Sequence, residues 1–152
     1  VCNETLRIYP VAMLIFPRVS LKSVNLAGRE IPPETVVMGS IYSTHHREDL
    51  YPQPNEFKPE RFLDQQFSPF EFLPFGGGAR RCIGSAFAML ELKLALAKIL
   101  SRWELELVDR RDIHAKRRGL VTAPERPIKL VVKSQRSSIN LTPAIHELPL
   151  LG

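Results

Sequence analysis

A glycine-rich segment at residues 75–84, F-G-G-G-A-R-R-C-I-G, constrains this chain more than any other stretch. Its three successive glycines remove every Cβ from a turn, so the backbone can lie close to a flat ligand or take positive φ. The proline-free residues 84–102 that follow are predicted to form a long helix. Cys82 therefore lies at a helix N-terminus, where free N–H groups and the helix dipole favour an anionic sulfur. Such a sulfur is a ligand for soft metals.

The residues around Cys82 strengthen this interpretation. Arg80 and Arg81 add positive charge, and a guanidinium can pair bidentately with a carboxylate. Cys82 alone would equally suit a small buried core residue. The whole segment favours a ligand loop.

The spacing F-x-x-G-x-R-x-C-x-G resembles the haem-binding signature of the cytochrome P-450 superfamily. The positions that fill it are Phe75, Gly78, Arg80, Cys82 and Gly84. Two further motifs follow the order of that family. The tetrapeptide E-T-L-R at 4–7 resembles the E-x-x-R of its K helix, and P-E-R-F at 59–62 resembles the P-x-R-F of its meander. The resemblance covers residues 1–133, and stretches such as T-H-H-R-E-D-L-Y-P look most like cyanobacterial and other bacterial members.

The resemblance implies a role for each matching position. Cys82 would be the axial thiolate ligand of the iron of haem b, and Phe75 would pack over its sulfur and tune it. Arg80 would pair with a haem propionate, for which Arg18 is a further candidate. The two glycines of the signature would let the loop and the helix approach the porphyrin.

The resemblance also suggests a substrate cavity and a docking surface. Apolar residues that would line the cavity, or that equally suit a core, are Val11, Ala12, Met13, Val121 and Thr122. Basic residues that would dock an acidic electron-donor protein, or that are ordinary solvated charges, are Arg81, Lys93, Lys98 and Arg102.

Three charged residues are expected to form a structural ion cluster. Glu4 and Arg7 are three residues apart, which places them on one helix face. The resemblance brings Arg61 to them, where two guanidiniums can share one carboxylate and fix the meander behind the haem loop. The sequence alone would allow only a surface ion pair.

The histidines offer a weaker alternative, a non-enzymatic Cys/His metal-binding domain. His45 and His46 are adjacent, which is poor spacing for two ligands from one helix. The chain has no C-x-x-C or H-x-x-x-H spacing of the kind that zinc sites use. Local hydrogen bonding in a loop is the better interpretation of both side chains.

The predicted fold class is α+β, the C-terminal part of the cytochrome P-450 fold. Residues 1–133 would form this part of the catalytic domain, and 134–152 a poorly ordered tail. The long helix at 84–102 is apolar on most sides, which predicts burial in a large core. The expected elements before this helix are the end of the K helix at 1–9, a buried strand at 11–16, a hairpin-like pair of 21–26 and 35–41 joined by turn residues 27–34, a short helix and loop at 43–56, and an irregular meander at 57–74. After it, strands are expected at 104–108 and 128–133, with a loop at 119–127 between them.

Composition excludes several classes of protein. With 44% hydrophobic and 24% charged residues, the chain is typical of a soluble globular protein, and no apolar stretch approaches the ~18 residues of a membrane span. Its net charge of +5 is scattered, without the basic stripe and aromatics of a nucleic-acid-binding protein. Two distant cysteines make no disulfide framework, which favours a reducing, cytoplasmic location. A membrane anchor in a missing N-terminal part stays open.

The implied function is a haem-thiolate monooxygenase that inserts one atom of O2 into an apolar organic substrate. Its electrons would come from a ferredoxin or a flavoprotein reductase. A haem-thiolate isomerase or dehydratase that does not use O2 is the alternative within the same fold. The chain starts at Val1 within the expected K helix. The acid and threonine that activate oxygen in the family would lie upstream, so the fragment alone is expected to be inactive.

Overall fold

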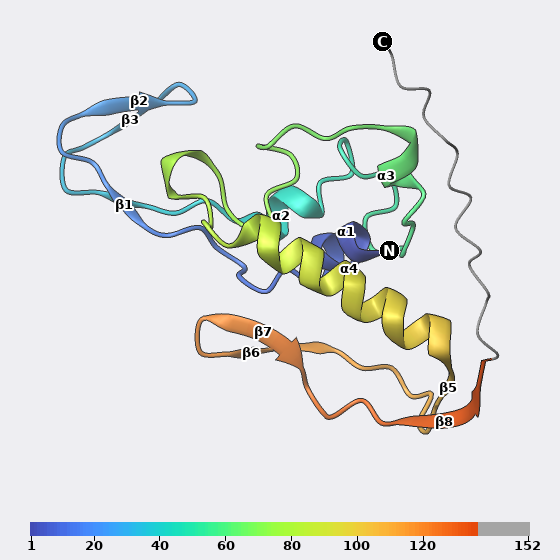
Figure 1. Cartoon of the computed structure of the whole chain (residues 1–152). Coiled ribbons are helices and arrows are strands. Elements are labelled where there is room, and N and C mark those ends of the chain that lie inside the picture. Colours follow the sequence, from blue (N-terminus) through green and yellow to red (C-terminus); the bar gives the residue numbers. More distant parts are fainter. Residues whose placement is uncertain (137–152) are drawn as a thin grey trace, which may run out of the picture.

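The longest described element, α4 (Ser85–Arg102), runs between two groups of short elements (Figure 1). The computed structural model describes residues 1–136. On one side of α4 lie an arm of short strands within residues 18–37 and the loops and short helices between it and α4, and on the other side lie the strands within residues 103–135. The three shorter α-helices in the described residues are α1 (Cys2–Ile8), α2 (Ile41–His45) and α3 (Arg61–Asp64).

The strands pair as four separate antiparallel ladders of two strands each. The pairs are β1 (Arg18–Val19) with β4 (Val36–Val37), β2 (Val24–Leu26) with β3 (Arg29–Ile31), β5 (Trp103–Leu107) with β8 (Leu130–Gln135), and β6 (Ala115–Arg118) with β7 (Val121–Pro124). This mixture of helices and strands confirms the predicted α+β class. The predicted C-terminal strands are confirmed as β5 and β8.

A hairpin forms in the predicted region, but with other partners: β2, within the expected strand at 21–26, pairs with β3, whereas β4, within the expected strand at 35–41, pairs with β1. Ala27 and Gly28 join β2 to β3, with φ of 51° and 81°. Positive φ at both positions is what a two-residue type I′ hairpin turn requires. Residues 29–31, which were assigned to the turn, therefore form a strand.

The prediction of a buried strand at 11–16 is wrong. In the described structure this run has a single bridge, between Leu14 and Ser40, and the side chains of Leu14 and Phe16 are exposed. An extended run becomes a strand only where a neighbouring strand satisfies its backbone hydrogen bonds. Here Ile15 donates to the Gly39 carbonyl, and the ladder extends no further.

The prediction of a simple loop at 119–127 is also wrong, because β7 lies within it. The two strands of the missed hairpin read A-K-R-R and V-T-A-P, and neither alternates apolar and polar residues. Gly119 turns the chain between them with φ of 64°. A hairpin without alternation has no periodic signal in the sequence.

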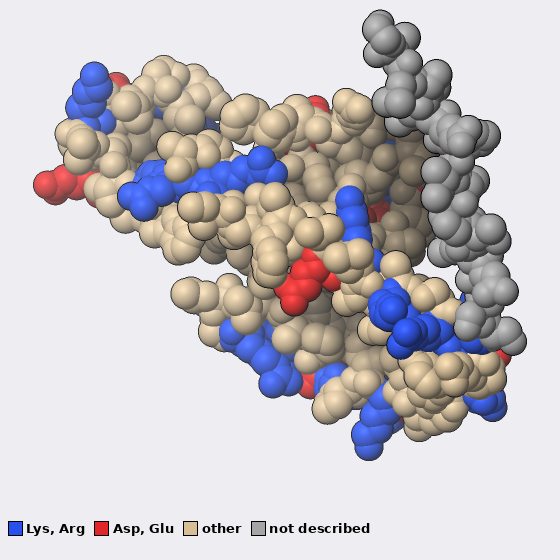
Figure 2. Space-filling view, viewed as in Figure 1, with Lys and Arg blue, Asp and Glu red and all other residues tan. Residues whose placement is uncertain are grey.

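Helix α4 has the predicted extent, but the expected burial is not found in residues 1–136. None of its residues is buried, and Phe87 is 70% exposed. The described elements with the most contacts to α4 are α1 and β5, which leave much of its circumference open. On the face in Figure 2, Lys and Arg side chains lie in several separate groups, and uncharged residues cover most of the area between them.

The best-buried part of the molecule lies around α1, α2 and the meander. Ile41 and Tyr51 are its buried apolar residues, and the polar side chains of Glu4, Arg7 and His45 are fully buried beside them. The meander is irregular, as predicted, apart from the four residues of α3.

The C-terminal strand lies two residues later than predicted, at Leu130–Gln135 instead of 128–133. Strand β8 ends at Gln135, and the amide of Arg136 still donates to the Arg102 carbonyl, at 2.8 Å. Residues 134–136, which were assigned to the tail, are thus ordered against the end of α4. The remainder of the predicted tail, 137–152, lies outside the described residues.

Candidate functional site

Backbone hydrogen bonds close the glycine-rich segment into a defined loop just before α4. The amide of Cys82 donates to the Phe75 carbonyl at 2.9 Å, and the amide of Gly76 donates to the Leu73 carbonyl at 2.9 Å. Gly76 and Gly78 take φ of 72° and 65°, a region that L-residues with a Cβ avoid. Their glycine identity therefore shapes the loop. Cys82 lies three residues before Ser85, the first residue of α4.

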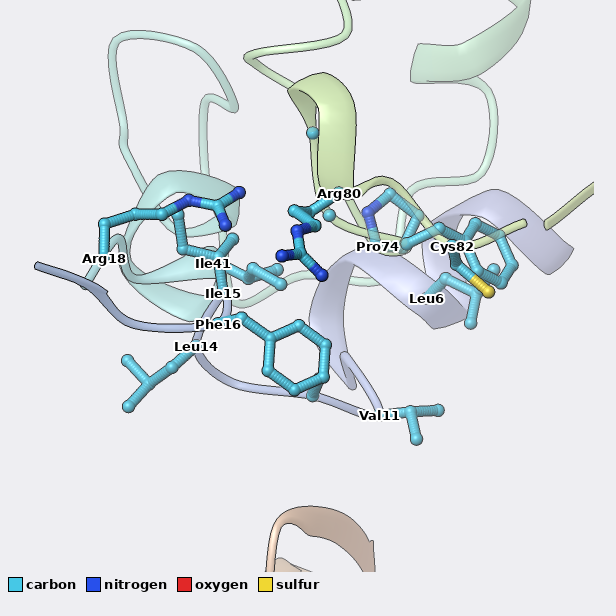
Figure 3. A pocket seen from close by; sticks show the side chains of 14 residues that line it. Leu6, Val11, Leu14, Ile15, Phe16, Arg18, Ile41, Pro74, Arg80 and Cys82 are labelled. Atoms are coloured by element: carbon cyan, nitrogen blue, oxygen red, sulfur yellow. The ribbon is translucent and has the colours of Figure 1, made fainter. Parts of the chain in front are cut away.

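The loop forms one wall of a cavity of about 290 Å³ (Figure 3). Cys82 and Arg80 contribute to it from the loop, and Arg18 contributes from β1. Among the described lining residues, these two arginines are the only charged ones. The rest of the lining is apolar side chains and glycine backbone: Leu6, Val11, Ala12, Leu14, Ile15, Phe16, Ile41, Pro74, Phe75, Gly76 and Gly77.

This set of groups fits haem b. A sulfur can bind iron, and apolar walls with glycine backbone suit a flat hydrophobic ring. Haem b carries two propionates, and Arg18 and Arg80 supply two guanidiniums that can pair with carboxylates. The structure therefore brings together four of the predicted haem contacts: Arg18, Phe75, Arg80 and Cys82.

The two signature glycines lie outside the lining of this cavity. A Cβ added at Gly84 would lie 3.9 Å from the Cys82 sulfur, which is ordinary contact. A Cβ added at Gly78 would meet nothing within 4 Å. The need for glycine at Gly78 thus comes from its positive φ. A role of either glycine in close approach to a porphyrin stays a prediction.

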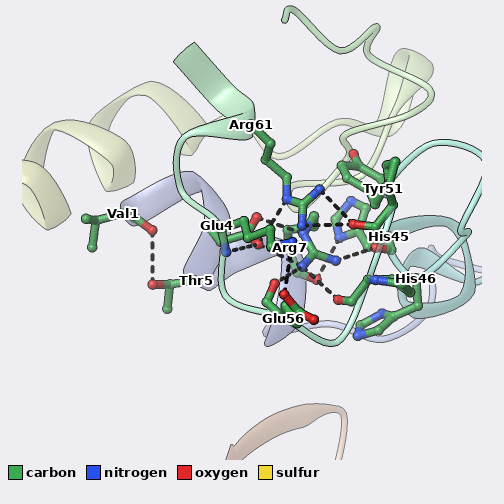
Figure 4. A network of polar contacts seen from close by, with 12 residues as sticks. Val1, Glu4, Thr5, Arg7, His45, His46, Tyr51, Glu56 and Arg61 are labelled. Atoms are coloured by element: carbon green, nitrogen blue, oxygen red, sulfur yellow. Dashed lines mark hydrogen bonds and ion pairs between the residues drawn. The ribbon is translucent and has the colours of Figure 1, made fainter. Parts of the chain in front are cut away.

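The predicted ion cluster is assembled and buried (Figure 4). Arg7 donates from Nε and Nη2 to the two carboxylate oxygens of Glu4, both at 2.8 Å. Arg61 donates from Nε to Glu4 Oε1 at 3.1 Å, and the backbone amide of Lys58 donates to the same oxygen at 3.0 Å. The cluster joins α1 to α3 and to the chain before it.

The carboxylate of Glu4 is held in its charged form. Burial by itself raises its pKa. The hydrogen bonds from Arg7 and from the Lys58 amide, together with the charges of Arg7 and Arg61, outweigh burial and hold the pKa below its usual value.

The environment of His45 was not predicted from the sequence. We expected a hydrogen-bonding loop side chain, yet it ends α2 and is fully buried. Its ring contacts the Arg7 carbonyl and the Leu73 amide, and it stacks on Phe72 at 5.4 Å. The pair H-H carries no sequence signal for this, because only the folded chain brings its partners together.

A metal site built from histidines receives no support. His46 stacks on Tyr42 at 3.9 Å, away from the ring contacts of its neighbour. Within residues 1–136, no group of three His, Cys, Asp or Glu side chains could hold a metal ion.

The predicted substrate-cavity residues divide between two cavities. Val11 and Ala12 line the cavity that contains Cys82. Thr122 lines a second cavity of about 480 Å³, between α1 and the β6–β7 hairpin. The two regions touch where the Thr122 amide donates to the Val11 carbonyl at 2.8 Å. Met13 and Val121 line neither cavity.

A loop-held cysteine, two guanidiniums and an apolar cavity are groups with which a haem-thiolate protein would hold its cofactor. A profile of the cytochrome P-450 family matches residues 1–132, and the chain belongs to this family. Members of the family bind haem b, with a cysteine thiolate as the axial ligand.

Individual relatives support the assignment. Cytochrome P-450 3A12 of Canis lupus familiaris is 40% identical over 145 residues, which are 92% of this chain and 28% of the relative. Lithocholate 6-beta-hydroxylase of Mesocricetus auratus is 38% identical over 91% of this chain and 28% of its own length. A solved zebra fish cytochrome P-450 structure with progesterone has a TM-score of 0.73 and 33% identity, covering 86% of this chain and 30% of that one. The chain therefore spans under a third of these relatives.

These comparisons confirm the family and the fold. The relatives named above are animal proteins, so the expected likeness to bacterial members stays a prediction. Among the helices of the described residues, none has the length and apolarity needed to cross a lipid bilayer.

Proposed function

We propose that this chain carries the thiolate-ligand part of a haem-thiolate monooxygenase, which inserts one atom of O2 into an apolar organic substrate. The observation that carries the proposal is the cavity that contains the Cys82 sulfur and the guanidiniums of Arg18 and Arg80. Family membership supports it, because the relatives include an enzyme named as a hydroxylase.

Each residue of the cavity has a task in this proposal. Cys82 would hold the iron through its thiolate, and Arg80 and Arg18 would hold the propionates. Haem with a thiolate ligand supplies O2 activation, favoured by the electron density that the sulfur donates. Phe75, whose carbonyl accepts from the Cys82 amide, would shield the sulfur from water and tune its donor strength.

The substrate that we propose is a rigid, largely apolar molecule of steroid size. Lithocholate and progesterone appear in the names of the relatives, and both are built on a four-ring steroid skeleton. Val11 and Ala12 would place apolar side chains beside the haem, which agrees with such a substrate.

The proposal includes an electron-donor protein and a reducing compartment. Arg81, Lys93, Lys98 and Arg102 remain the proposed docking residues for a ferredoxin or a flavoprotein reductase. Cys2 and Cys82 are both free, as a reducing, cytoplasmic location would require.

The decisive experiment compares the two cysteines in the complete natural polypeptide that carries this sequence. Cys82→Ala should remove the red-shifted Soret band that a thiolate gives in the reduced, carbon-monoxide-bound state. Cys2→Ala, which changes a residue of α1 outside the cavity, should keep both the band and the haem content. Full haem uptake with a thiolate band in Cys82→Ala would refute the proposal.

A further inference from the structure

His45 connects the buried ion cluster to the segment that leads to Cys82. Its side chain is 0% exposed. Nε2 lies 3.0 Å from the backbone nitrogen of Leu73, and Nδ1 lies 3.3 Å from the carbonyl oxygen of Arg7. An amide nitrogen donates and a carbonyl oxygen accepts, so these partners assign the ring proton to Nδ1 and the lone pair to Nε2.

The connection between His45 and α1 is reciprocal. While the ring donates to the Arg7 carbonyl, Nη1 of Arg7 donates to the His45 carbonyl at 2.7 Å. The guanidinium that makes this bond is held in turn by Glu4. The ring therefore has a fixed support on the side away from the loop.

Backbone hydrogen bonds continue the connection from Leu73 to the cysteine. The Leu73 carbonyl accepts from the Gly76 amide at 2.9 Å, and the Phe75 carbonyl accepts from the Cys82 amide at 2.9 Å. The single bond from the His45 ring to the Leu73 amide thus anchors the first residue of this closed loop.

Resting on the proposed function, we propose that His45 is a positioning residue for the thiolate ligand. Its neutral form, protonated at Nδ1, ties residues 73–76 to α1 and so holds the loop in which the Cys82 sulfur would meet the haem iron.

The surroundings of His45 keep the ring neutral. Burial, opposed by the hydrogen bond with the Arg7 carbonyl and assisted by the charges of Arg7 and His46, lowers the pKa of the ring to about 4. The titratable or charged groups packed near it, from α1, α2, α3 and the chain between, are Glu4, Arg7, His46, Tyr51 and Arg61.

These surroundings set the direction of a pH effect. An unfolded histidine has a pKa near 6.5, so the unfolded chain takes up a proton that folded His45 excludes. The stabilisation from neutral His45 is complete above pH 6.5 and is lost as the pH falls from 6.5 towards about 4. A proton on Nε2 would face the Leu73 N–H, donor against donor, and release the loop.

Two substitutions separate the anchor from general stability. In His45→Gln the side-chain amide can place its oxygen near the position of Nε2 and still accept from Leu73. In His45→Asn the shorter amide reaches only the Nδ1 position, so the Leu73 amide loses its acceptor. Unlike the His45 ring, the amide side chain that replaces it in either variant does not titrate between pH 4 and 6.5. His46→Asn is the matched control, because its ring contacts Tyr42 instead of the loop.

The measurements are amide hydrogen exchange and the reduced, carbon-monoxide-bound spectrum of the complete natural polypeptide. We expect His45→Asn to speed exchange at the amides of Leu73 and Gly76 about tenfold and to lower the fraction with a thiolate Soret band. His45→Gln and His46→Asn should stay near wild type. The acid-induced loss of the thiolate band between pH 6.5 and 4 should be present in wild type and absent in His45→Gln.

Unchanged exchange at the Leu73 and Gly76 amides in His45→Asn, or the same increase in His46→Asn, would overturn the proposal. Should His45→Asn fail to fold, loss of the band at the same pH in wild type and His45→Gln would overturn it instead. Hydrogen exchange does not need haem. A wild type that takes up no haem, but shows the expected exchange pattern, would refute the proposed function and support the anchor.

Discussion

Arg7 shows how a single side chain organises this part of the molecule. Its guanidinium binds the carboxylate of Glu4, the carbonyl of His45 and, at 2.8 Å, the carbonyl of Pro54. The ring of Tyr51 lies 5.0 Å from its Cζ atom. With no exposed surface, this charge depends entirely on its protein partners.

Loss of either charge of the central pair should therefore be severe. We expect Arg7→Ala or Glu4→Ala to lower the free energy of unfolding by about 3–5 kcal/mol, because the remaining charge is buried without its partner. Haem incorporation should be abolished in both variants. Urea unfolding and haem content are the measurements. Arg110→Ala, which breaks an exposed pair with Glu106, is the control and should change neither value. Normal haem content in Glu4→Ala would contradict this expectation.

In the ligand loop at residues 75–84, the backbone φ angles of single glycines determine the course of the chain. Gly76 has φ of 72°, whereas its neighbour Gly77 lies in the extended region with φ of −141°. A Cβ at Gly76 would find its nearest neighbour at 4.0 Å, and one at Gly77 would find it at 3.7 Å. Space is therefore similar at both positions, and only the backbone differs.

This difference in φ predicts that two adjacent substitutions change the free energy of unfolding by different amounts. Gly76→Ala should lower the free energy of unfolding by about 1–2 kcal/mol, the cost of a Cβ in the left-handed region. Gly77→Ala should be close to neutral in this measurement, which is urea unfolding of the haem-free protein. Equal losses in both variants would show that crowding, not φ, controls the loop.

The elements also show where sequence-based prediction of secondary structure succeeded and where it failed. The bounds of α4 were predicted closely, because an uninterrupted proline-free run after glycine is a local signal. The prediction of a strand at 11–16 failed because strand formation depends on a neighbouring strand. The hairpin of β6 and β7 was missed because neither strand alternates apolar and polar residues.

For the whole molecule, the dominant feature is apolar surface without a cover. Phe87 and Leu94 of α4 and Ile83 before it are exposed in the described structure. Large apolar side chains left exposed in such number favour an interface or a tendency to associate. The chain also spans only 28% of the dog relative.

We therefore expect the 152-residue chain by itself to associate through its exposed apolar side chains and to be inactive. It should bind a hydrophobic fluorescent dye and associate at micromolar concentration, and it should not hydroxylate a substrate when given a redox partner. Dye titration, size-exclusion chromatography and a turnover assay measure these properties. The complete natural polypeptide serves as the reference. A monomer that binds no dye, or any turnover by the chain alone, would contradict the expectation.

The amino-acid sequence by itself determined the ligand loop, the helix after it and the family, since these depend on residue types at close spacing along the chain. It also indicated the Glu4–Arg7 pair, which one helix turn brings together. The family resemblance made Arg18 a candidate partner of the same cofactor as Cys82, but only the tertiary structure placed both in one cavity. It alone decided that His45 bridges Arg7 and Leu73 and that α4 is left open in the described residues. Those properties depend on contacts between residues far apart in the chain, and no local pattern encodes such contacts.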